Sequence, residues 1–266
     1  MKKFKALVTN DDGIDSVFLH QFVEALIPNF EVNVAAPSTE QSWIGRAISR
    51  HKSIKVLKSE TLFPDNVNAW SISGTPTDCV NIALGHLLEG PPDIILSGIN
   101  LGYNTTEILI LSSGTIAGAI EGSLWGFPSI AFSQEIPKHL YEEIHSNKGI
   151  SSGDFYNVVQ ASVKKAAEIA LQQIQNKSDF TKNRVLNVNF PKNMNGNTNT
   201  EWTRPEKIHL GSLFRKDSNG NYCFEYTNGK RVCKHPNTDR SALRRGNISI
   251  SLLDFGQISL TLPSPK

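Results

Sequence analysis

The sequence predicts an α/β fold in which a mostly parallel sheet is covered by helices and followed by a C-terminal extension rich in β-hairpins. The chain has 266 residues, of which 39% are hydrophobic and 20% charged, which allows a sizeable core and excludes wholesale disorder. In the first half, short apolar runs alternate with longer amphipathic stretches, a pattern typical of βα units. From residue 192 to residue 237 the chain becomes polar and rich in turn-forming residues.

The predicted elements follow this alternation along the chain. Strands are expected at residues 4–9, 32–36, 68–72, 94–96 and 129–132, and later at 185–190, 248–253 and 258–262. Helices are expected at residues 18–27, 76–86, 113–124 and 155–174. We therefore expect three segments: a core of residues 1–191, an irregular hairpin-bearing extension of residues 192–247, and residues 248–266 returning to the core as strands.

Charge and cysteine content exclude several classes of protein. The 27 basic and 25 acidic side chains leave a formal net charge of +2, so no basic field for nucleic acid is expected. Three cysteines without a CxxC spacing argue against a disulfide framework or a cysteine zinc site. The basic start meets a polar segment too early for an export signal, and no apolar run reaches the length of a membrane span. We expect a cytoplasmic protein with no nucleic-acid or membrane partner.

Polar side chains that follow the predicted strands form the candidate site. Ligands of open α/β sheets collect at the carboxyl ends of the strands, where Asp11, Asp12, Ser42 and Asn100 can converge. These four residues offer only oxygen ligands of the hard type, which suits Mg²⁺ or Mn²⁺ and disfavours zinc. The alternative is structural: one of the two carboxylates caps the first helix and the other is solvated.

Two segments of the sequence are candidate phosphate sites. Residues 73–75 and residues 113–115 both read Ser-Gly-Thr, and each precedes a predicted helix. A helix N-terminus presents free N–H groups and a favourable dipole to an anion. Either segment alone is more often only an N-cap. Two of them beside an acidic metal site point to a phosphate ligand.

Competing signatures are absent or lack their context. The sequence contains no G-x-G-x-x-G after the first strand, no P-loop, no Asp-x-Asp at the first strand and no Cys-x5-Arg. Residues 149–153 spell G-x-S-x-G but follow a polar stretch rather than a strand, so a serine esterase using Ser151 is only a lesser alternative. Arg240, Arg244 and Arg245 are expected to form a solvated face, with a contact to substrate phosphate or to another subunit as the lesser alternative.

Taken together, five ordered segments resemble the SurE (survival protein E) family of metal-dependent nucleotidases. The matching segments are residues 7–13, 36–37 with 41–42, 73–80, 97–100 and 113–115, and weaker matches continue beyond residue 133. The resemblance implies a Rossmann-like three-layer core, a swapped C-terminal extension that serves oligomerisation, and a homodimer or homotetramer. It also implies a 5′-nucleotidase that hydrolyses nucleoside monophosphates, with 3′-nucleotidase and exopolyphosphatase activity as further options.

The resemblance also assigns roles to residues. One divalent ion per subunit, Mg²⁺ or Mn²⁺, is held by the residues matching Asp11, Asp12, Ser42 and Asn100. Phosphate is held by the loop matching Asn104 and by the segment matching Ser113, Gly114 and Thr115. The chain departs from the family at Trp43, where a small residue is usual, and in a loop between residues 100 and 113 that is one residue longer.

The favoured hypothesis is therefore a phosphomonoesterase in which an ion-activated water attacks the phosphate of a nucleotide. The N–H groups around residues 113–115 would stabilise the charge that gathers in the transition state. Asp11 or Asp12 would accept the proton, and the sequence does not choose between them. The alternative hypothesis is a nucleotide- or metal-binding protein with lost or altered turnover, which the changed loop of residues 101–112 suggests.

Overall fold

The fold is built around one long mixed sheet. The structure is a computed structural model and describes residues 3–59, 62–176, 183–232 and 235–256. The sheet strands are β1 (Phe4–Thr9), β2 (Phe30–Pro37), β3 (Val56–Lys58), β4 (Asn68–Ile72), β5 (Ile94–Leu101), β6 (Ser129–Gln134), β7 (Arg184–Phe190), β8 (Thr200–Trp202) and β13 (Ile248–Asp254). Their order across the sheet is β3-β4-β2-β1-β5-β6-β7-β13-β8. The six strands from β4 to β7 are parallel, which confirms the predicted α/β class.

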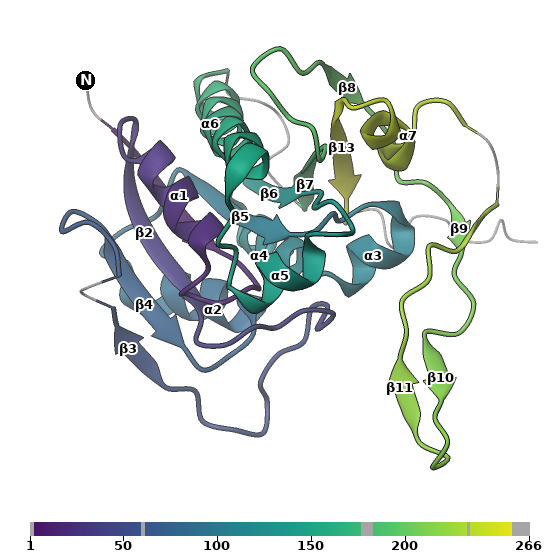
Figure 1. The fold of residues 1–266 in the computed structure, drawn as a ribbon. Coiled ribbons are helices and arrows are strands. Elements are labelled where there is room, and N and C mark those ends of the chain that lie inside the picture. Colours follow the sequence, from purple (N-terminus) through teal and green to yellow (C-terminus); the bar gives the residue numbers. More distant parts are fainter. Residues whose placement is uncertain (1–2, 60–61, 177–182, 233–234, 257–266) are drawn as a thin grey trace, which may run out of the picture.

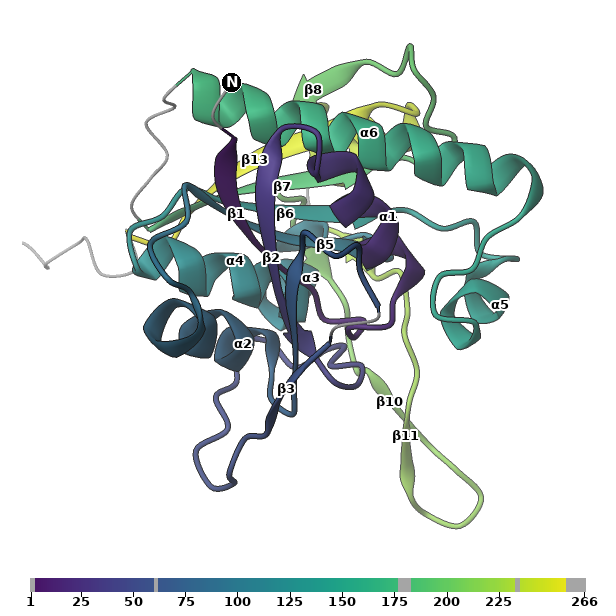
Figure 2. The same ribbon diagram turned by 90° about the vertical axis from the view of Figure 1, so that its left-hand side faces the viewer.

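Helices cover both faces of the sheet and make it the middle of three layers. Helices α1 (Val17–Leu26) and α6 (Gly153–Gln175) pack together on one face, and α2 (Pro76–Ile82) and α4 (Gly114–Leu124) pack together on the other (Figures 1 and 2). The central strands β1, β2 and β5 are largely apolar because helices cover them on both sides. The sequence signal for these strands was therefore a short apolar run rather than an alternating one.

Two glycines bring α4 close to the sheet. A Cβ atom on Gly118 would lie 2.8 Å from Cγ2 of Thr9, and one on Gly122 would lie 2.6 Å from Cγ1 of Ile95. Such contacts are too short for a side chain larger than hydrogen. The glycine spacing of this helix therefore serves close packing, as the sequence analysis favoured, and this packing sets the height of the α4 N-terminus above the sheet.

Several short elements were not predicted. The segment from residue 100 to residue 112 was expected to be a loop, but β5 continues to Leu101 and α3 (Thr106–Ser112) follows it. The helix expected at residues 76–86 ends as a π-helix, Ala83–Leu87. Helices α5 (Tyr141–Ser146) and α7 (Asp239–Arg244) and strands β3 and β8 are too short to give a periodic signal. The strand predicted at residues 258–262 lies outside the described residues.

The C-terminal part both completes the sheet and leaves it. Strand β13 pairs antiparallel with β7 and parallel with β8. Between β8 and α7 lies an arm, residues 208–231, with the strand pairs β9 (Ile208–His209) with β12 (Lys230–Arg231), and β10 (Phe214–Lys216) with β11 (Tyr222–Phe224). Figure 1 shows β10 and β11 extending away from the body of the molecule.

The apolar helices of the described part were tested against the length of a membrane span. None of them alone is long and apolar enough to cross a bilayer, and α3 and α4 reach the required length and composition only as a pair bent by 72°. Helix α4 is almost entirely buried in the core.

Candidate functional site

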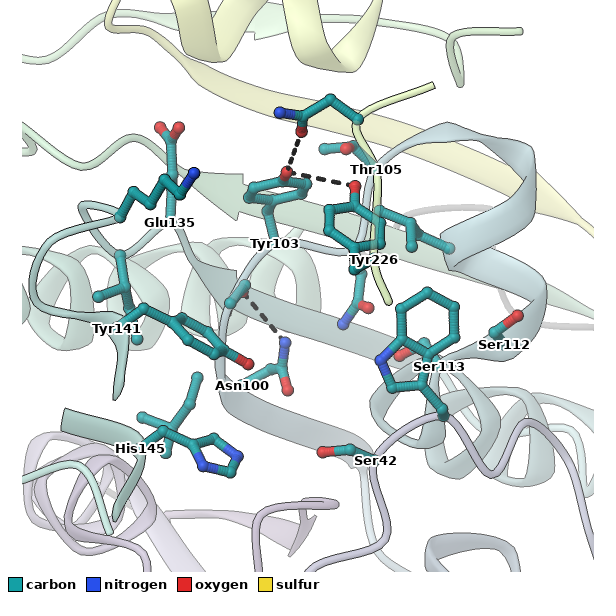
Figure 3. A pocket seen from close by; sticks show the side chains of 18 of the residues that line it. Ser42, Asn100, Tyr103, Thr105, Ser112, Ser113, Glu135, Tyr141, His145 and Tyr226 are labelled. Carbon is teal, nitrogen blue, oxygen red and sulfur yellow. Dashed lines mark hydrogen bonds between the residues drawn. The ribbon is translucent and has the colours of Figure 1, made fainter. Parts of the chain in front are cut away.

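A cavity of about 950 Å³ opens at the carboxyl ends of the central strands. The loops after β1, β2 and β5, the start of α4, helices α5 and α7, and the arm all contribute to it. Figure 3 shows lining residues from the loop after β2 (Ser42), the start of α4 (Ser113), α5 (Tyr141 and His145) and the arm (Tyr226). The residues predicted for the site that line this cavity are Asp11, Ser42, Asn100, Asn104 and Ser113. We call Asp11, Asp12, Ser42 and Asn100 the acidic end of the site.

Asp11 is the most buried carboxylate of the acidic end, with 3% of its surface exposed. Its Oδ1 accepts a hydrogen bond of 2.6 Å from the hydroxyl of Thr115, and its backbone oxygen accepts one of 2.7 Å from the N–H of Gln41. Burial raises the pKa of Asp11 to about 6, although the hydrogen bonds from Thr115 act in the opposite direction. The side chain is thus fixed in position but poorly solvated as an anion.

Asp12 adds a second carboxylate to the same end. Its Oδ2 accepts a hydrogen bond of 3.0 Å from the N–H of Leu101, which ties the loop after β1 to the end of β5. Burial and the charge of Asp11 raise the pKa of Asp12 well above its ordinary value. Neither carboxylate caps α1, because that helix begins at Val17 with Ser16 as its N-cap residue. The structural alternative considered for this pair is therefore wrong.

Ser42, on the loop after β2, and Asn100, near the end of β5, supply neutral oxygens. Asn100 donates from Nδ2 to the backbone oxygen of Gly102 at 3.1 Å, which fixes the orientation of the amide and leaves its oxygen available. Figure 3 shows the side chains of Ser42 and Asn100 pointing into the same part of the cavity. Within the described ranges no group of three or more His, Cys, Asp and Glu residues could hold a metal. The acidic end differs from such a group because only two of its four residues are carboxylates.

The start of α4 borders the acidic end. The hydroxyl of Ser113 accepts a hydrogen bond of 3.1 Å from the N–H of Ile116 and so caps the helix. Gly114 lies so close to the loop after β1 that a Cβ there would be 2.7 Å from Cβ of Asp11. The first N–H groups of α4 have no acceptor within the helix and lie next to Asp11. This helix start can therefore bind an anion at the place where the carboxylates could bind a cation.

Asn104 lines the cavity but is largely buried, with 7% of its surface exposed. Its Nδ2 donates to the hydroxyls of Thr115, at 3.2 Å, and Ser133, at 2.9 Å. Its backbone N–H donates to Asn189 at 2.8 Å, and its backbone oxygen accepts from Asn187 at 2.9 Å. These bonds connect Asn104 to Thr115 and, through Thr115, to Asp11. The geometry favours a positioning role over a direct contact with a ligand.

The second predicted anion segment has a purely structural role. Thr75 and Asp78 form a capping box at the start of α2, and the Thr75 hydroxyl also donates to the backbone oxygen of Ala47 at 2.7 Å. Residues 73–75 do not line the cavity. Two identical Ser-Gly-Thr segments therefore differ in environment, and only the one at residues 113–115 lies beside the carboxylates.

Ser151 lies between α5 and α6 and does not follow a strand, so it lacks the context of a nucleophile elbow.

The expectation of a solvated arginine face is wrong for Arg240, whose side chain is 13% exposed, whereas the side chain of Arg244 is 48% exposed. Arg240 and Arg244 line the cavity, and both lie near Glu206, a carboxylate with no exposed surface. Burial and the neighbouring guanidinium of Arg231 lower the pKa of Arg244. Arg245 points elsewhere and pairs with Glu201 at 2.5 Å. We call Arg240, Arg244, Lys138 and Lys192, which all line the cavity, its basic end.

Sequence reasoning missed two further parts of the cavity. On one side, α5 supplies Tyr141 and His145, which stack on each other, and His145 pairs with Glu40 at 3.1 Å. Burial and the charge of Asp12 raise the pKa of Tyr141 to about 12. On the other side, aromatic residues of the arm reach the loop after β2. None of these residues belongs to a recognisable motif, because short irregular segments far apart in sequence bring them together.

Comparison with known proteins finds similarity to SurE proteins in each case. A family model described as "Survival protein SurE" matches residues 6–211. A protein of Nostoc sp. named 5′-nucleotidase SurE is 45% identical over 131 residues, which cover 48% of this chain and 49% of that protein. A 5′-nucleotidase SurE of Methanoculleus marisnigri is 31% identical over 94% of this chain and 90% of its own length. The chain therefore spans about half the length of the first relative and most of the second.

A solved structure is similar as well. The crystal structure of the SurE protein from Aquifex aeolicus superposes with a TM-score of 0.73 and 26% sequence identity, covering 97% of this chain and 94% of that one. The likeness extends over the C-terminal part of the chain as well as the strands of the core.

Proposed function

Because the chain belongs to the SurE family, we propose that it is a divalent-metal-dependent phosphomonoesterase that acts on nucleoside monophosphates. The observation that carries this proposal is the meeting of Asp11, Ser42, Asn100 and Ser113 around one cavity at the carboxyl ends of the strands. Proteins named 5′-nucleotidase among its relatives support the same activity. Hydrolysis of 3′-monophosphates and of polyphosphate are further activities that the proposal includes.

The acidic end fits a hard divalent cation. Two adjacent carboxylates with raised pKa values repel each other, and a cation between them would relieve that repulsion. Asp11, Asp12, Ser42 and Asn100 offer oxygen atoms only, which is the ligand set of Mg²⁺ or Mn²⁺ rather than of zinc. In the proposal these four residues hold one ion per subunit. When bound, the ion would neutralise phosphate charge and lower the pKa of a coordinated water molecule.

The remaining chemistry falls to residues of this chain. One carboxylate of the pair would take the proton of the attacking water as its oxygen bonds to phosphorus and the ester P–O bond breaks, and that proton would then pass to the departing nucleoside oxygen. The N–H of Gly114, at the start of α4, stabilises the charge on the phosphoryl oxygens, while Thr115 donates to Asp11. Asn104 and Thr115 act through Asp11: the chain of hydrogen bonds from Asn104 to Thr115 to Asp11 keeps the carboxylate in place.

The proposal includes a homodimer or homotetramer in the cytoplasm. Aromatic side chains are exposed along the arm, and Phe214 and Tyr222 at its outer strands are 56% and 68% exposed. An isolated pair of short strands is stable only marginally, so a second copy that covers these side chains would stabilise the arm. Sedimentation analysis of the wild-type chain and of a Phe214→Ser, Tyr222→Ser double variant tests this part, and an unchanged mass would contradict it.

The decisive experiment is release of inorganic phosphate. The purified chain is incubated with nucleoside 5′- and 3′-monophosphates and with polyphosphate, each with Mg²⁺, Mn²⁺ or a chelator. We expect release from nucleoside 5′-monophosphates that the chelator abolishes. No release from any nucleotide with either ion would overturn the proposal, and tight nucleotide binding without release would favour the binding-protein alternative.

A further inference from the structure

Four aromatic residues form one side of the cavity. The ring centroids of Trp43 and Phe224 are 5.0 Å apart in an edge-to-face arrangement, and those of Trp43 and Tyr226 are 5.9 Å apart. The hydroxyl of Tyr226 is 3.4 Å from that of Tyr103. All four residues line the cavity, and we call them the aromatic wall. Figure 3 shows Tyr103 and Tyr226 beside each other above Asn100.

The aromatic wall starts directly beside the acidic end. Trp43 follows Ser42, and Tyr103 comes three residues after Asn100. Neighbouring Cα atoms are about 3.8 Å apart, so a ligand whose phosphate reaches Ser42 and Asn100 has the wall within reach of its other end. A substrate with a planar group a short distance from its phosphate would match this order of polar and aromatic residues.

The backbone holds Trp43 in a defined position. Its φ is 59°, in the left-handed region that a bulky side chain rarely adopts. Hydrogen bonds fix the loop on both sides: the N–H of Gln41 donates to Asp11 at 2.7 Å, and the N–H of Gly45 donates to Ser112 at 2.9 Å. The loop therefore presents the indole to the cavity before any ligand arrives.

The aromatic wall is open to a ligand. Trp43, Phe224 and Tyr226 are 40%, 49% and 36% exposed, although each packs against another ring. Beside them Thr105 has no exposed surface, and its hydroxyl has no hydrogen-bond partner within the described part of the chain. The three exposed rings therefore offer faces for stacking, whereas the Thr105 hydroxyl is covered.

The chemistry of the wall selects its ligand. A nucleobase is neutral and planar, and it stacks on aromatic side chains whatever its identity. The four wall residues carry no charge of their own, although Arg240 of the basic end lies beside the phenols: Arg240 and the Tyr103 hydroxyl both donate to Oδ1 of Asn228, at 3.3 and 3.5 Å. The ring faces of Trp43 and Phe224, farther along the wall, therefore fit the base of a nucleotide.

We propose that the aromatic wall binds the nucleobase and that Trp43 is the specificity-determining residue that makes nucleoside monophosphates better substrates than phosphate esters without a base. This inference rests on the proposed function for its substrate class. It adds a nucleobase-binding subsite to that function, formed by residues of the loop after β2 and of the arm. Base stacking on an aromatic side chain contributes an affinity factor of about 10- to 100-fold.

The test compares two substrates in the full-length chain. For wild type and Trp43→Ala, kcat/KM is measured with a nucleoside 5′-monophosphate and with ribose 5-phosphate, which carries the same phosphate and sugar but no base. We expect Trp43→Ala to lower the nucleotide value about 10- to 100-fold and to leave the ribose 5-phosphate value within about twofold. Trp43→Phe retains a ring and should lose much less. Trp202→Ala, which removes an indole that is 65% exposed on β8, should change neither value.

Other results would overturn the inference. An equal loss with both substrates would mean that Trp43 supports the acidic end rather than the base, and an unchanged ratio would mean that the base binds elsewhere. A change in oligomer mass in Trp43→Ala, with an unchanged substrate ratio, would assign the wall to a second copy of the chain. If Trp43→Ala does not fold, Phe224→Ala replaces it, since Phe224 packs on Trp43 from the arm; a preserved ratio there refutes the wall.

A binding measurement separates this inference from the proposed function. If the wild-type chain releases no phosphate from either substrate, the proposed function fails. Calorimetric titration with the nucleoside monophosphate in the presence of Mn²⁺ then still tests the wall: binding by wild type that Trp43→Ala weakens about tenfold or more supports it. Equal binding by both proteins refutes it.

Discussion

The acidic end and the arm contribute to the same cavity, but different forces hold them in place. Asp11 and Asp12 follow a buried parallel strand and are hydrogen-bonded to α4 and to the end of β5. The arm consists of strands of two or three residues, and Glu206 anchors its base: Arg231 binds this carboxylate, and Arg240 and Arg244 approach it. The residues proposed for catalysis thus lie on the core, whereas part of the proposed nucleobase subsite lies on the arm, which has few contacts with the core.

Removing one carboxylate of the acidic end gives the largest expected effect. We expect Asp12→Asn to lower kcat/KM more than about 1000-fold, because the ion supplies several kcal/mol of charge stabilisation and is held by only two anions. The fold should survive, since Asp12 caps no helix and its burial with Asp11 is electrostatically unfavourable. Phosphate release and chemical denaturation check both parts.

The exposed Asp65→Asn is the matched control for this prediction and should change neither activity nor stability. Addition of Mn²⁺ should raise the melting temperature of wild type and of Asp65→Asn but not of Asp12→Asn, because a ligand that binds only the folded state stabilises it. A variant at residue 12 that unfolds, or that keeps its response to Mn²⁺, would contradict the assignment.

The second largest expected effect is the loss of stability when Glu206, which holds the base of the arm, is replaced. Glu206→Gln leaves the guanidinium groups of Arg231, Arg240 and Arg244 without their shared counter-charge. Loss of one partner of a buried ion pair costs about 3 kcal/mol or slightly more, here at the low end because Arg231 and Arg244 are partly exposed. We expect faster amide hydrogen exchange in residues 208–231 and unchanged exchange in β1 and β5.

Glu201→Gln provides the comparison for that experiment. Glu201 pairs with Arg245 nearer the surface, so its loss should cost well under about 1 kcal/mol and leave the arm protected. If Glu206→Gln also leaves the exchange of the arm unchanged, the arm is held by contacts other than this carboxylate.

Asp239 makes the arm and α3 sensitive to pH. It accepts backbone N–H groups of Thr106, at 2.7 Å, and Glu206, at 3.0 Å, and burial raises its pKa to about 6. Between about pH 4 and about pH 6, Asp239 is therefore protonated in the folded state but ionised in the unfolded state. This difference stabilises the folded state at low pH, and the stabilisation is lost as pH rises from about 4 to above 6. The free energy of unfolding of wild type relative to Asp239→Asn should fall by about 2 kcal/mol between about pH 4.5 and about pH 7.5.

The difference between wild type and Asp239→Asn isolates this group, since other titrating carboxylates are common to both proteins. Urea denaturation with a chelator present measures it, because the chelator removes any pH-dependent binding of metal. A difference that is constant with pH, or that grows with rising pH, would contradict the raised pKa.

Prediction from sequence worked best where one physical cause acts locally. Long apolar runs and the helix of residues 155–174 gave clear patterns, and β1, β4 and α6 were found within a few residues of their bounds. Strand ends of a parallel sheet meet at one edge, so Asp11, Ser42 and Asn100 could be expected together although three different strands position them. Their roles as ligands still remain a prediction.

The parts that the sequence did not reveal depend on tertiary contacts. Helix α3 has seven residues, and nothing local marks its first turn, where Thr106 has a positive φ. Arg240 looks like a surface charge in the sequence until the fold places it beside the buried Glu206. The two Ser-Gly-Thr segments are identical in sequence, and only the contacts of Thr75 with Asp78 and of Thr115 with Asp11 distinguish a cap from a site.

The smallest expected effect comes from adding one carbon atom to Gly114, where the start of α4 packs against Asp11. Gly114→Ala places a Cβ 2.7 Å from Cβ of Asp11 and 3.1 Å from the backbone oxygen of Gln41, so α4 must move away from the acidic end. We expect a loss of about 1–2 kcal/mol in stability and about tenfold in kcat/KM, because overpacking strains the core and shifts the anion-binding helix start. In Gly85→Ala the new Cβ meets only a ring atom of Trp125 at 3.8 Å, so stability should stay equal or rise slightly. Full activity in Gly114→Ala would mean that the start of α4 does not need its close approach to Asp11.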